Sequence, residues 1–212
     1  MLKQLKTSIL SVVILGIFAG LVFPLVITAI AQTAFPRQAN GSLIKRADGT
    51  VVGSELIAQG FTKPEYFHPR PSAAGNGYDA TSSGGTNLGP TSDKLINGVH
   101  KKTADGKDDP SNFDGVKDLA AAYRKENGLS ADAQVPADAV TRSASGLDPD
   151  ISIENAYLQA ARVAKARGMR EEQVRALIDD HARGVRARLL GEPRVNVLQL
   201  NMALDDLASS QH

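Results

Sequence analysis

The 212-residue sequence has no cysteine and no tryptophan, and only 5% of its residues are aromatic. Without cysteine the chain can form no disulfide framework, no thiolate zinc site, no iron–sulfur cluster and no cysteine nucleophile. Its 24 lysine and arginine residues are balanced by 23 aspartate and glutamate residues, so the formal net charge is +1. A protein that coats nucleic acid normally has a strong basic excess. We therefore expect no nucleic-acid partner.

Charged residues are absent from one long segment near the N-terminus. Residues 7–35 contain no charged side chain, and residues 8–31 are almost entirely apolar. As a helix these 24 residues would rise about 36 Å, which is enough to cross a hydrocarbon core of about 30 Å. The sequence therefore predicts a cytoplasmic N-terminus (1–7), a transmembrane helix in the lipid bilayer (8–31) and one extracytoplasmic soluble domain (32–212).

A cleaved signal peptide is the alternative interpretation of this segment. Lys3 and Lys6 form a positive start, and residues 29–31 (Ala-Ile-Ala) fit a small-x-small cleavage site. The apolar region of a signal peptide runs about 7–15 residues, however, and this one is longer, which favours a retained anchor. Cationic residues are nearly balanced on its two sides. Those before it lie closer to it, so we expect a single-pass membrane protein with its N-terminus in the cytoplasm and its C-terminal domain outside.

Small residues recur along the predicted membrane helix. Gly16, Gly20 and Pro24 are spaced at i, i+4 and i+8, which places them roughly on one face. Small residues allow the backbone of another helix to approach closely inside a bilayer. The spacing therefore predicts a helix-packing face formed by these three residues.

The rest of the chain predicts a single mixed α+β domain, with strands early and late and helices between them. Two short strands flank an Asp48-Gly49 turn, and Ser54 is expected to cap a short helix that ends at Ala58. Residues 61–92 are rich in proline and glycine, which excludes regular helix. This stretch also holds half of the aromatic residues beyond residue 31, whereas flexible linkers have few. We therefore expect an ordered, irregular loop.

Helical periodicity dominates the C-terminal half of the chain. The expected elements are a helix from a cap at Ser111 to a stop at Gly128, a helix over 152–167 closed by Gly168, a helix over 170–190 with Val185 on its apolar stripe, a strand over 195–200, and a short last helix capped by Asn201.

Motifs for catalysis are weak or incomplete. Residues 84–89 (GGTNLG) have the glycine spacing of a phosphate-binding loop, but Pro90 stands where that loop needs lysine. No Asp-Lys-Thr-Gly motif for an aspartyl-phosphate is present. The four histidines, at positions 68, 100, 181 and 212, do not show the spacing of metal ligands. We therefore expect no catalytic residue, no metal site and no cofactor of the chain's own.

Several distinctive segments occur in order along the chain: 60–73 (GFTKPEYFHPRPSA), 83–90 (SGGTNLGP), 135–138 (VPAD), 141–149 (TRSASGLDP), 160–164 (AARVA) and 191–201 (GEPRVNVLQLN). Together with the single apolar segment, they resemble the C subunits of the bacterial Kdp high-affinity potassium-transporting ATPases over nearly the whole chain. The chain departs from that pattern at Asp150, where a histidine is expected before Ile151 and Ser152.

The resemblance implies a non-catalytic subunit of a membrane complex. Its partners would be a channel-like potassium-selective subunit, a P-type subunit that hydrolyses ATP and a small single-helix subunit, so ATP and potassium are involved only through the complex. The family is described as a catalytic chaperone that raises the ATP affinity of the pump subunit. The stretch with Ser83, Gly84, Gly85 and Asn87 loosely resembles the Ser-Gly-Gly-Gln signature of ABC transporters and is the candidate nucleotide contact.

An extracytoplasmic domain, however, cannot meet ATP that is bound on the cytoplasmic side. The alternative hypothesis is therefore that the domain stabilises the complex. It would then shape how potassium enters at the mouth of the channel-like subunit, without touching ATP.

Overall fold

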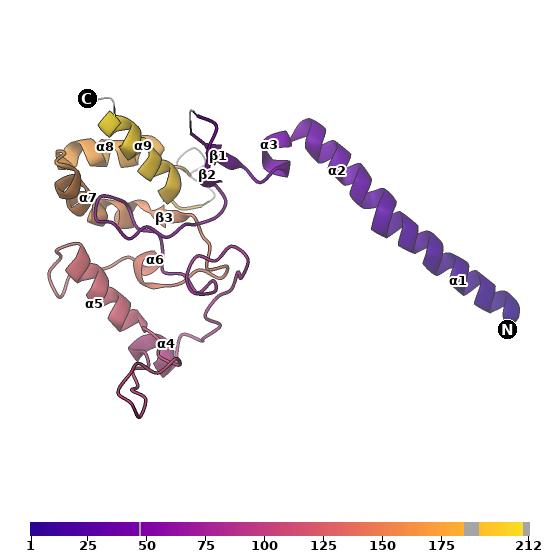
Figure 1. Cartoon of the computed structure of the whole chain (residues 1–212), viewed down its shortest axis with the longest axis horizontal. Coiled ribbons are helices and arrows are strands. Elements are labelled where there is room, and N and C mark those ends of the chain that lie inside the picture. Colours follow the sequence, from indigo (N-terminus) through magenta and orange to yellow (C-terminus); the bar gives the residue numbers. More distant parts are fainter. Residues whose placement is uncertain (47, 185–190, 210–212) are drawn as a thin grey trace. The chain divides into compact units, whose positions relative to one another are not determined.

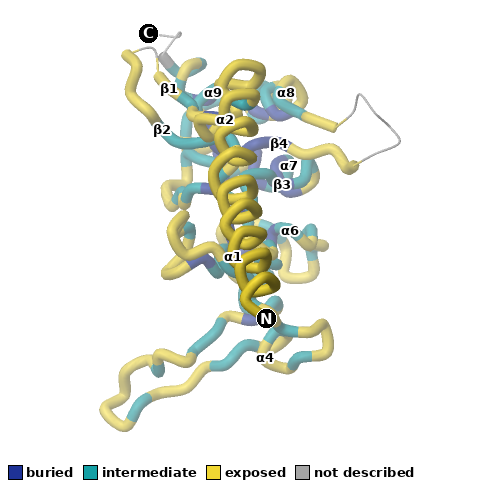
Figure 2. Tube along the Cα trace, turned by 90° about the vertical axis from the view of Figure 1, so that its right-hand side faces the viewer, coloured by how far each residue is buried: buried dark blue, intermediate teal, exposed yellow. Residues whose placement is uncertain are grey.

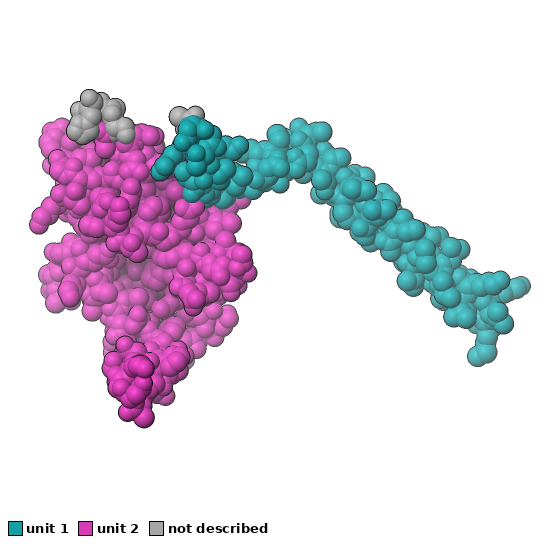
Figure 3. Space-filling view, in the orientation of Figure 1, with its two compact units in different colours: residues 1–54 teal, residues 55–212 magenta. Residues whose placement is uncertain are grey.

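The computed structural model describes residues 1–46, 48–184 and 191–209 of the chain. The chain divides into two compact units, Met1–Ser54 and Glu55–His212 (Figure 3). No membrane is present to mark the bilayer boundary. The predicted boundaries at residues 7 and 31 therefore stay predictions.

The first unit begins with one long apolar helix. It consists of α1 (Leu2–Ile17), the π-helical turn η1 (Phe18–Val22) and α2 (Phe23–Ala34). None of its residues is buried, and Figure 2 shows almost all of this helix in the yellow of exposed residues. Its 33 residues are long and apolar enough to cross a membrane. The structure thus confirms the predicted helix, which extends beyond residues 8–31 at both ends.

The π-helical turn lies where a proline interrupts the α-helical hydrogen bonds. Pro24 has no N–H to donate to the Gly20 carbonyl, and its ring crowds that carbonyl. The Phe23 amide donates instead to the Phe18 carbonyl, five residues back, which is the π-helical pattern. In a uniform α-helix, residues four apart drift by about 40° around the axis. A π-helical turn has more residues per turn, which reduces this angular offset. Gly16, Gly20 and Pro24 therefore lie closer to a single line along the helix surface.

A short helix and a hairpin complete the first unit. The elements are α3 (Pro36–Ala39), β1 (Leu43–Lys45) and β2 (Val51–Ser54), and the two strands pair antiparallel with Leu43 opposite Ser54. The Thr50 amide donates to the Asp48 carboxylate at 2.8 Å, and Gly49 has a φ of +85°. Both are features of a tight turn. The predicted Asp48-Gly49 hairpin is therefore confirmed.

The predicted helix from Ser54 to Ala58 is wrong. Ser54 is the last residue of β2, and its hydroxyl donates to the Gly41 carbonyl at 2.7 Å. Residues 55–57 form a turn, and the Ala58 amide donates to the Leu147 carbonyl at 2.9 Å. Ser54 precedes apolar residues as a helix N-cap often does, but its hydroxyl bonds to the residues before the hairpin instead of to a helix amide.

The second unit mixes helices with one short strand pair (Figure 1). In its described part the elements are α4 (Asp93–Asn97), α5 (Val116–Glu126), α6 (Ala137–Val140), β3 (Asp150–Ser152), α7 (Ile153–Arg167), α8 (Glu171–His181), β4 (Arg194–Asn196) and α9 (Val197–Ser209). Strands β3 and β4 pair antiparallel, with Ile151 opposite Val195. Helices α7, α8 and α9 pack with this pair. The α+β class is therefore confirmed.

Two apolar clusters form the core of this unit. The larger one joins β3, β4, α7, α8 and α9 to one aromatic side chain of the long loop, Phe67, which is fully buried. Its other buried members are Ile151, Ala156, Ala160, Val163, Ala164, Val174, Ile178, Val195, Val197, Leu200 and Leu204. The smaller cluster surrounds Tyr123 of α5, with Ala139 and Val140 of α6. The Tyr123 hydroxyl donates to the Asn155 side chain at 2.8 Å, and burial raises the pKa of this phenol.

The loop over residues 61–92 is ordered, as predicted, although it contains no helix or strand. Two carboxamides hold its centre. Asn201 accepts the Phe67 amide at 2.8 Å and donates to the Phe67 carbonyl at 3.0 Å. Gln159 accepts the His68 amide at 2.7 Å and donates to the His68 carbonyl at 3.0 Å. Each carboxamide thus pairs both the N–H and the C=O of one loop residue, as a neighbouring strand would in a β-sheet.

An arginine of α7 holds the start of the same loop. Arg162 donates to the carbonyls of Pro64 at 2.7 Å and Tyr66 at 2.9 Å. It also donates to the side chains of Asn127 and Gln159. Burial lowers the pKa of Arg162. The loop backbone therefore finds its partners in helix side chains rather than in a strand.

The helix predictions are right in position and partly wrong at the ends. Helix α7 begins after Ser152, whose hydroxyl accepts the Asn155 amide at 3.1 Å, and it ends at Gly168 with a φ of +65°. Both ends were predicted. Helix α5 also forms, but it begins after Gly115 rather than at Ser111. The Gly115 amide donates to the Asp118 carboxylate at 2.9 Å.

The predictions for the C-terminal segment need correction. Helix α8 ends at His181, so the predicted helix is wrong over residues 182–184, where Ala182 is extended and Arg183 forms a β-bridge with Arg194. The rest of the predicted continuation, through Val185 to residue 190, lies outside the described residues. The predicted strand over 195–200 ends at Asn196, whose side chain accepts the Gln199 amide at 3.1 Å and so caps α9. Asn201 lies inside that helix and is buried. It clamps the loop instead of capping a helix.

We predict that Asn201→Ala lowers the free energy of unfolding by about 1–3 kcal/mol, because it leaves the buried Phe67 amide and carbonyl without partners. Urea unfolding of the detergent-solubilised chain measures this. Gln134→Ala, which removes an exposed carboxamide, is the control and should change stability by less than about 0.5 kcal/mol. Equal losses in the two variants would refute the role of the clamp.

Candidate functional site

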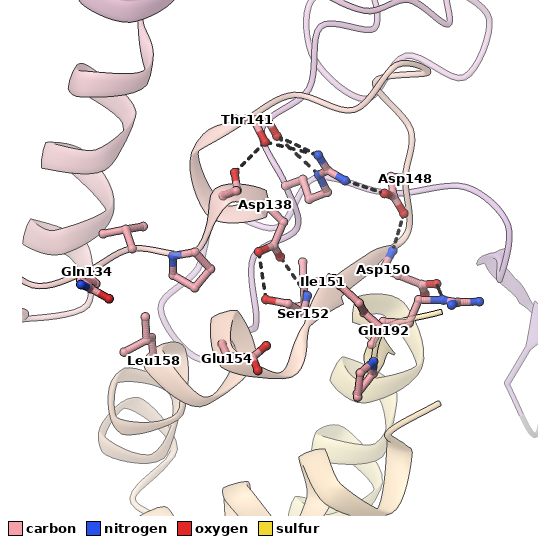
Figure 4. A pocket seen from close by; sticks show the side chains of 16 residues that line it. Gln134, Asp138, Thr141, Asp148, Asp150, Ile151, Ser152, Glu154, Leu158 and Glu192 are labelled. Atoms are coloured by element: carbon pink, nitrogen blue, oxygen red, sulfur yellow. Dashed lines mark hydrogen bonds and ion pairs between the residues drawn. The ribbon is translucent and has the colours of Figure 1, made fainter. Parts of the chain in front are cut away.

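A cavity of about 970 Å³ opens between α6, β3, the start of α7 and residues 192–194 (Figure 4). Its volume is in the range of sites that bind small molecules or peptide side chains. Residues of the segments 135–138, 141–149 and 191–201, which carry the family resemblance, meet here in space. We therefore treat this cavity, called the acidic pocket below, as the candidate functional site.

Carboxylates outnumber cationic groups in the acidic pocket. The lining contains Asp138, Asp148, Asp150, Glu154 and Glu192, and its cationic members are Arg70 and Arg194. Both arginines are engaged. Arg70 contacts Asp148 at 2.9 Å, and Arg194 contacts Asp150 at 2.7 Å. Asp150, the departure from the family pattern, therefore neutralises a cation of the same wall.

Two of the carboxylates cover the outer edge of β3. Asp138 accepts the Ser152 amide at 2.8 Å, the Ser152 hydroxyl at 2.9 Å and the Asn155 side chain at 2.9 Å. Asp148 accepts the Asp150 amide at 3.1 Å. The amides of Asp150 and Ser152 therefore point away from β4 and are already satisfied. This edge offers no free amide of β3 to an incoming strand.

The remaining two carboxylates are open to solvent. Glu154, in the first turn of α7, and Glu192, before β4, are exposed and form no hydrogen bond or ion pair with the residues that the structure describes. Apolar surface lies beside them, contributed by Val135, Pro136, Ile151, Leu158 and Pro193. Among the described residues, the pocket thus combines negative charge that has no ion-pair partner with apolar walls. The sequence did not reveal it, because its acids come from separate segments without a motif spacing.

The predicted nucleotide-contact residues lie together beside residues 144–146. The Ser83 hydroxyl and the Gly84 amide both donate to the Ser145 carbonyl at 2.9 Å. A Cβ at Gly85 would come within 2.9 Å of the Ala144 carbonyl, so only glycine fits this approach. In this conformation the donors of Ser83 and Gly84 are used inside the domain. A nucleotide contact by these residues and by Asn87, which is exposed, stays a prediction.

Two histidines form pairs that their spacing in the sequence did not indicate. His68 contacts the Glu126 carboxylate at 2.6 Å, and this hydrogen bond lowers the pKa of Glu126. His100 contacts Asp118 at 2.9 Å. One potential ligand atom from each of His100, Asp114 and Asp118 lies within 4.8 Å of the other two. Such a group could approach a metal ion. Asp118 is already engaged by the Gly115 amide and His100, however, so the geometry is equally that of a helix start.

The structure describes one of the other two histidines. His181 contacts the carbonyl of Leu177 one turn earlier in its helix. His212 lies outside the described residues. The predicted helix-packing residues are open, since a Cβ at Gly16 or Gly20 would meet no atom within 4 Å.

Comparison with known proteins tests the family resemblance. The family model described as "K+-transporting ATPase, c chain" matches residues 5–206. The chain belongs to this family. It is 53% identical over 205 residues to the potassium-transporting ATPase KdpC subunit of Caulobacter sp. strain K31, covering 97% of this chain and 94% of the relative. It is 48% identical over 207 residues to the subunit of the same name from Mycobacterium bovis strain BCG / Pasteur 1173P2, covering 98% and 100%.

These names confirm the interpretation of the chain as a KdpC-type subunit rather than a catalytic enzyme in itself. The KdpC resemblance also extends through both compact units, because the match begins inside α1 and ends inside α9. The acidic pocket and the apolar helix are thus both parts of one family architecture.

The open glycines of α1 and η1 lead to a prediction about assembly. We expect Gly20→Leu to lower recovery of the ATPase complex in mild detergent by about threefold or more, because a leucine would keep a partner helix away. Membrane insertion should be unchanged, since leucine is more apolar than glycine. Ala19→Leu, one position away on the same helix, is the control. Equal recovery of the two variants would contradict the packing face.

The His68–Glu126 pair leads to a prediction about acid stability. The pKa of Glu126 is lower in the folded chain than its ordinary value of 4.5. The carboxylate therefore contributes stability that is present above pH 4.5 and is lost as the pH falls through the folded pKa. We expect Glu126→Gln to lose less stability than the wild type between about pH 5 and pH 3. Urea unfolding at each pH measures this, and parallel pH profiles would refute it.

Proposed function

We propose that this chain is an accessory subunit of an ATP-driven, high-affinity potassium uptake complex. One membrane helix anchors it, with the N-terminus in the cytoplasm and the soluble domain outside the inner membrane. The domain stabilises the complex and shapes how potassium enters at the mouth of the channel-like subunit, without touching ATP. Family membership supports the potassium-transport setting, and the charge of the acidic pocket supports the mode of action.

The charge of the pocket is the observation that carries this choice. A nucleotide is polyanionic, and proteins hold phosphates with free backbone amides, helix N-termini and cationic side chains. In the acidic pocket, by contrast, five carboxylates face two arginines, and both arginines are in ion pairs. In the glycine-rich stretch, the Ser83 hydroxyl and the Gly84 amide donate to the Ser145 carbonyl. These features favour cationic or protein ligands over ATP.

The catalytic-chaperone role, in which the chain raises the ATP affinity of the pump subunit, is the second hypothesis. It stays a prediction. With an extracytoplasmic domain, the chain would act on ATP affinity by favouring one conformation of the pump subunit, since coupling between distant sites needs no shared ligand. A direct contact would instead require the loop of Gly84 and Gly85 to face the cytoplasm and release its internal hydrogen bonds.

The orientation can be tested because the chain has no cysteine. We expect a single cysteine at the exposed position Glu172 to react with a membrane-impermeant maleimide in spheroplasts from which the outer membrane has been removed. A cysteine at Lys3 should react only after the inner membrane is opened. The reverse pattern would place the domain in the cytoplasm and revive the direct nucleotide contact.

Removing the second unit separates the two functional hypotheses. We expect a chain that ends at Ser54, the boundary of the first unit, to yield a complex that needs about fivefold or more potassium for half-maximal ATPase activity. The ATP concentration for half-maximal activity should stay within about twofold of the wild type. The opposite result, with a changed ATP requirement and an unchanged potassium requirement, would support the catalytic chaperone.

A further inference from the structure

We propose that the acidic pocket receives a segment of a partner subunit that carries lysine or arginine next to apolar side chains. The inference rests on the proposed function, because it names the chemistry of the partner that the soluble domain contacts. The pocket shows three features that such a segment requires, namely uncompensated negative charge, apolar walls and enough volume.

The negative charge comes from three different elements. Asp148 and Asp150 are neutralised by arginines, which leaves Asp138 of α6, Glu154 of α7 and Glu192 before β4. None of these three forms an ion pair with a residue in the described ranges 1–46, 48–184 and 191–209. Figure 4 shows them on separate walls of the pocket. A cation that enters between them would therefore be attracted from more than one side.

The walls explain why the ligand is a side chain rather than a free ion. Val135, Pro136 and Leu158 line the cavity beside the carboxylates. The aliphatic stem of lysine or arginine can cover such apolar surface while its charged end reaches the acids. A bare or hydrated ion would leave these walls unused, and a cavity of about 970 Å³ is far larger than one ion needs. The shape and chemistry thus fit several side chains of one peptide segment.

The edge of β3 decides how this segment binds. The amides of Asp150 and Ser152 already donate to the carboxylates of Asp148 and Asp138. A partner cannot bond to these amides by adding a strand at this edge. Recognition therefore depends on side chains, with the free carboxylates of Glu154 and Glu192 as the groups that a partner cation can reach.

Site-specific photocrosslinking in the intact complex tests the location. A photoreactive amino acid replaces Glu154 in the full chain, and the control replaces Glu172, an exposed glutamate in the first turn of α8. We expect the probe at position 154 to crosslink to a partner-subunit peptide that contains lysine or arginine, as identified by mass spectrometry. The probe at position 172 should not crosslink to that peptide.

A charge-neutralising double variant tests the chemistry. Glu154→Gln with Glu192→Gln removes both free carboxylates, and Glu172→Gln removes a glutamate from the same position of another helix. We expect the double variant to lower recovery of the complex at moderate salt by about threefold to tenfold. Rising sodium chloride should reduce recovery of the wild type towards that of the double variant, because salt screens the attraction. The control variant should behave as the wild type.

Several results would overturn the proposal. In the crosslinking experiment, these are an intact complex without a crosslink from position 154, or a crosslink only to a segment without a basic residue, to lipid or to a second copy of this chain. In the charge experiment, the contrary result is a double variant whose recovery equals that of its control. Failure of the wild-type chain to copurify with the ATPase subunits would instead refute the proposed function itself.

Discussion

The second unit depends on two carboxamides that take the place of a β-strand. Asn201 and Gln159 each bond both backbone groups of one residue in the proline-rich loop, Phe67 and His68. Because Pro69 follows at once, this stretch cannot continue as a regular strand with every amide paired. The carboxamides satisfy the backbone where no strand can, so the Phe67 ring enters the core with its own backbone N–H and C=O paired. The packing of α7 and α9 around that ring follows from these four hydrogen bonds.

The same clamp determines the position of the acidic pocket. Arg70 lies two residues after His68 and contacts Asp148 and the Thr141 carbonyl in the pocket wall. The Tyr78 hydroxyl then donates to the Arg70 carbonyl at 2.7 Å, and burial raises the pKa of this phenol to about 12. The phenol therefore stays protonated, and the bond stays intact, across the physiological range. An irregular loop is thus held by specific hydrogen bonds, and it connects the apolar core directly to the site.

The sequence predicts the features that depend on neighbours along the chain. The membrane helix follows from a run without charge, and α7 follows from Ser152 and Gly168 at its ends. The predictions fail where the deciding partner is distant. The sequence over residues 195–200 is compatible with a strand, but only Val195 and Asn196 belong to β4. From Val197 on the residues form α9, which Asn196 rather than Asn201 caps. The pocket could not be predicted for the same reason, since its acids have no common spacing and only folding brings them together.

Two weak attachments on one chain can hold a complex more strongly than either alone. In the complex that we propose, the apolar helix would confine the chain to the bilayer, and the open line of Gly16, Gly20 and Pro24 would offer a partner helix a close approach. Once that helix is bound, the acidic pocket meets its partner at a high effective concentration. An exposed charge pair with Glu154 or Glu192, which contributes little by itself, then suffices to orient the domain. This arrangement suits a subunit that acts by touching its neighbours, because the contact can be released and remade without the chain leaving the complex.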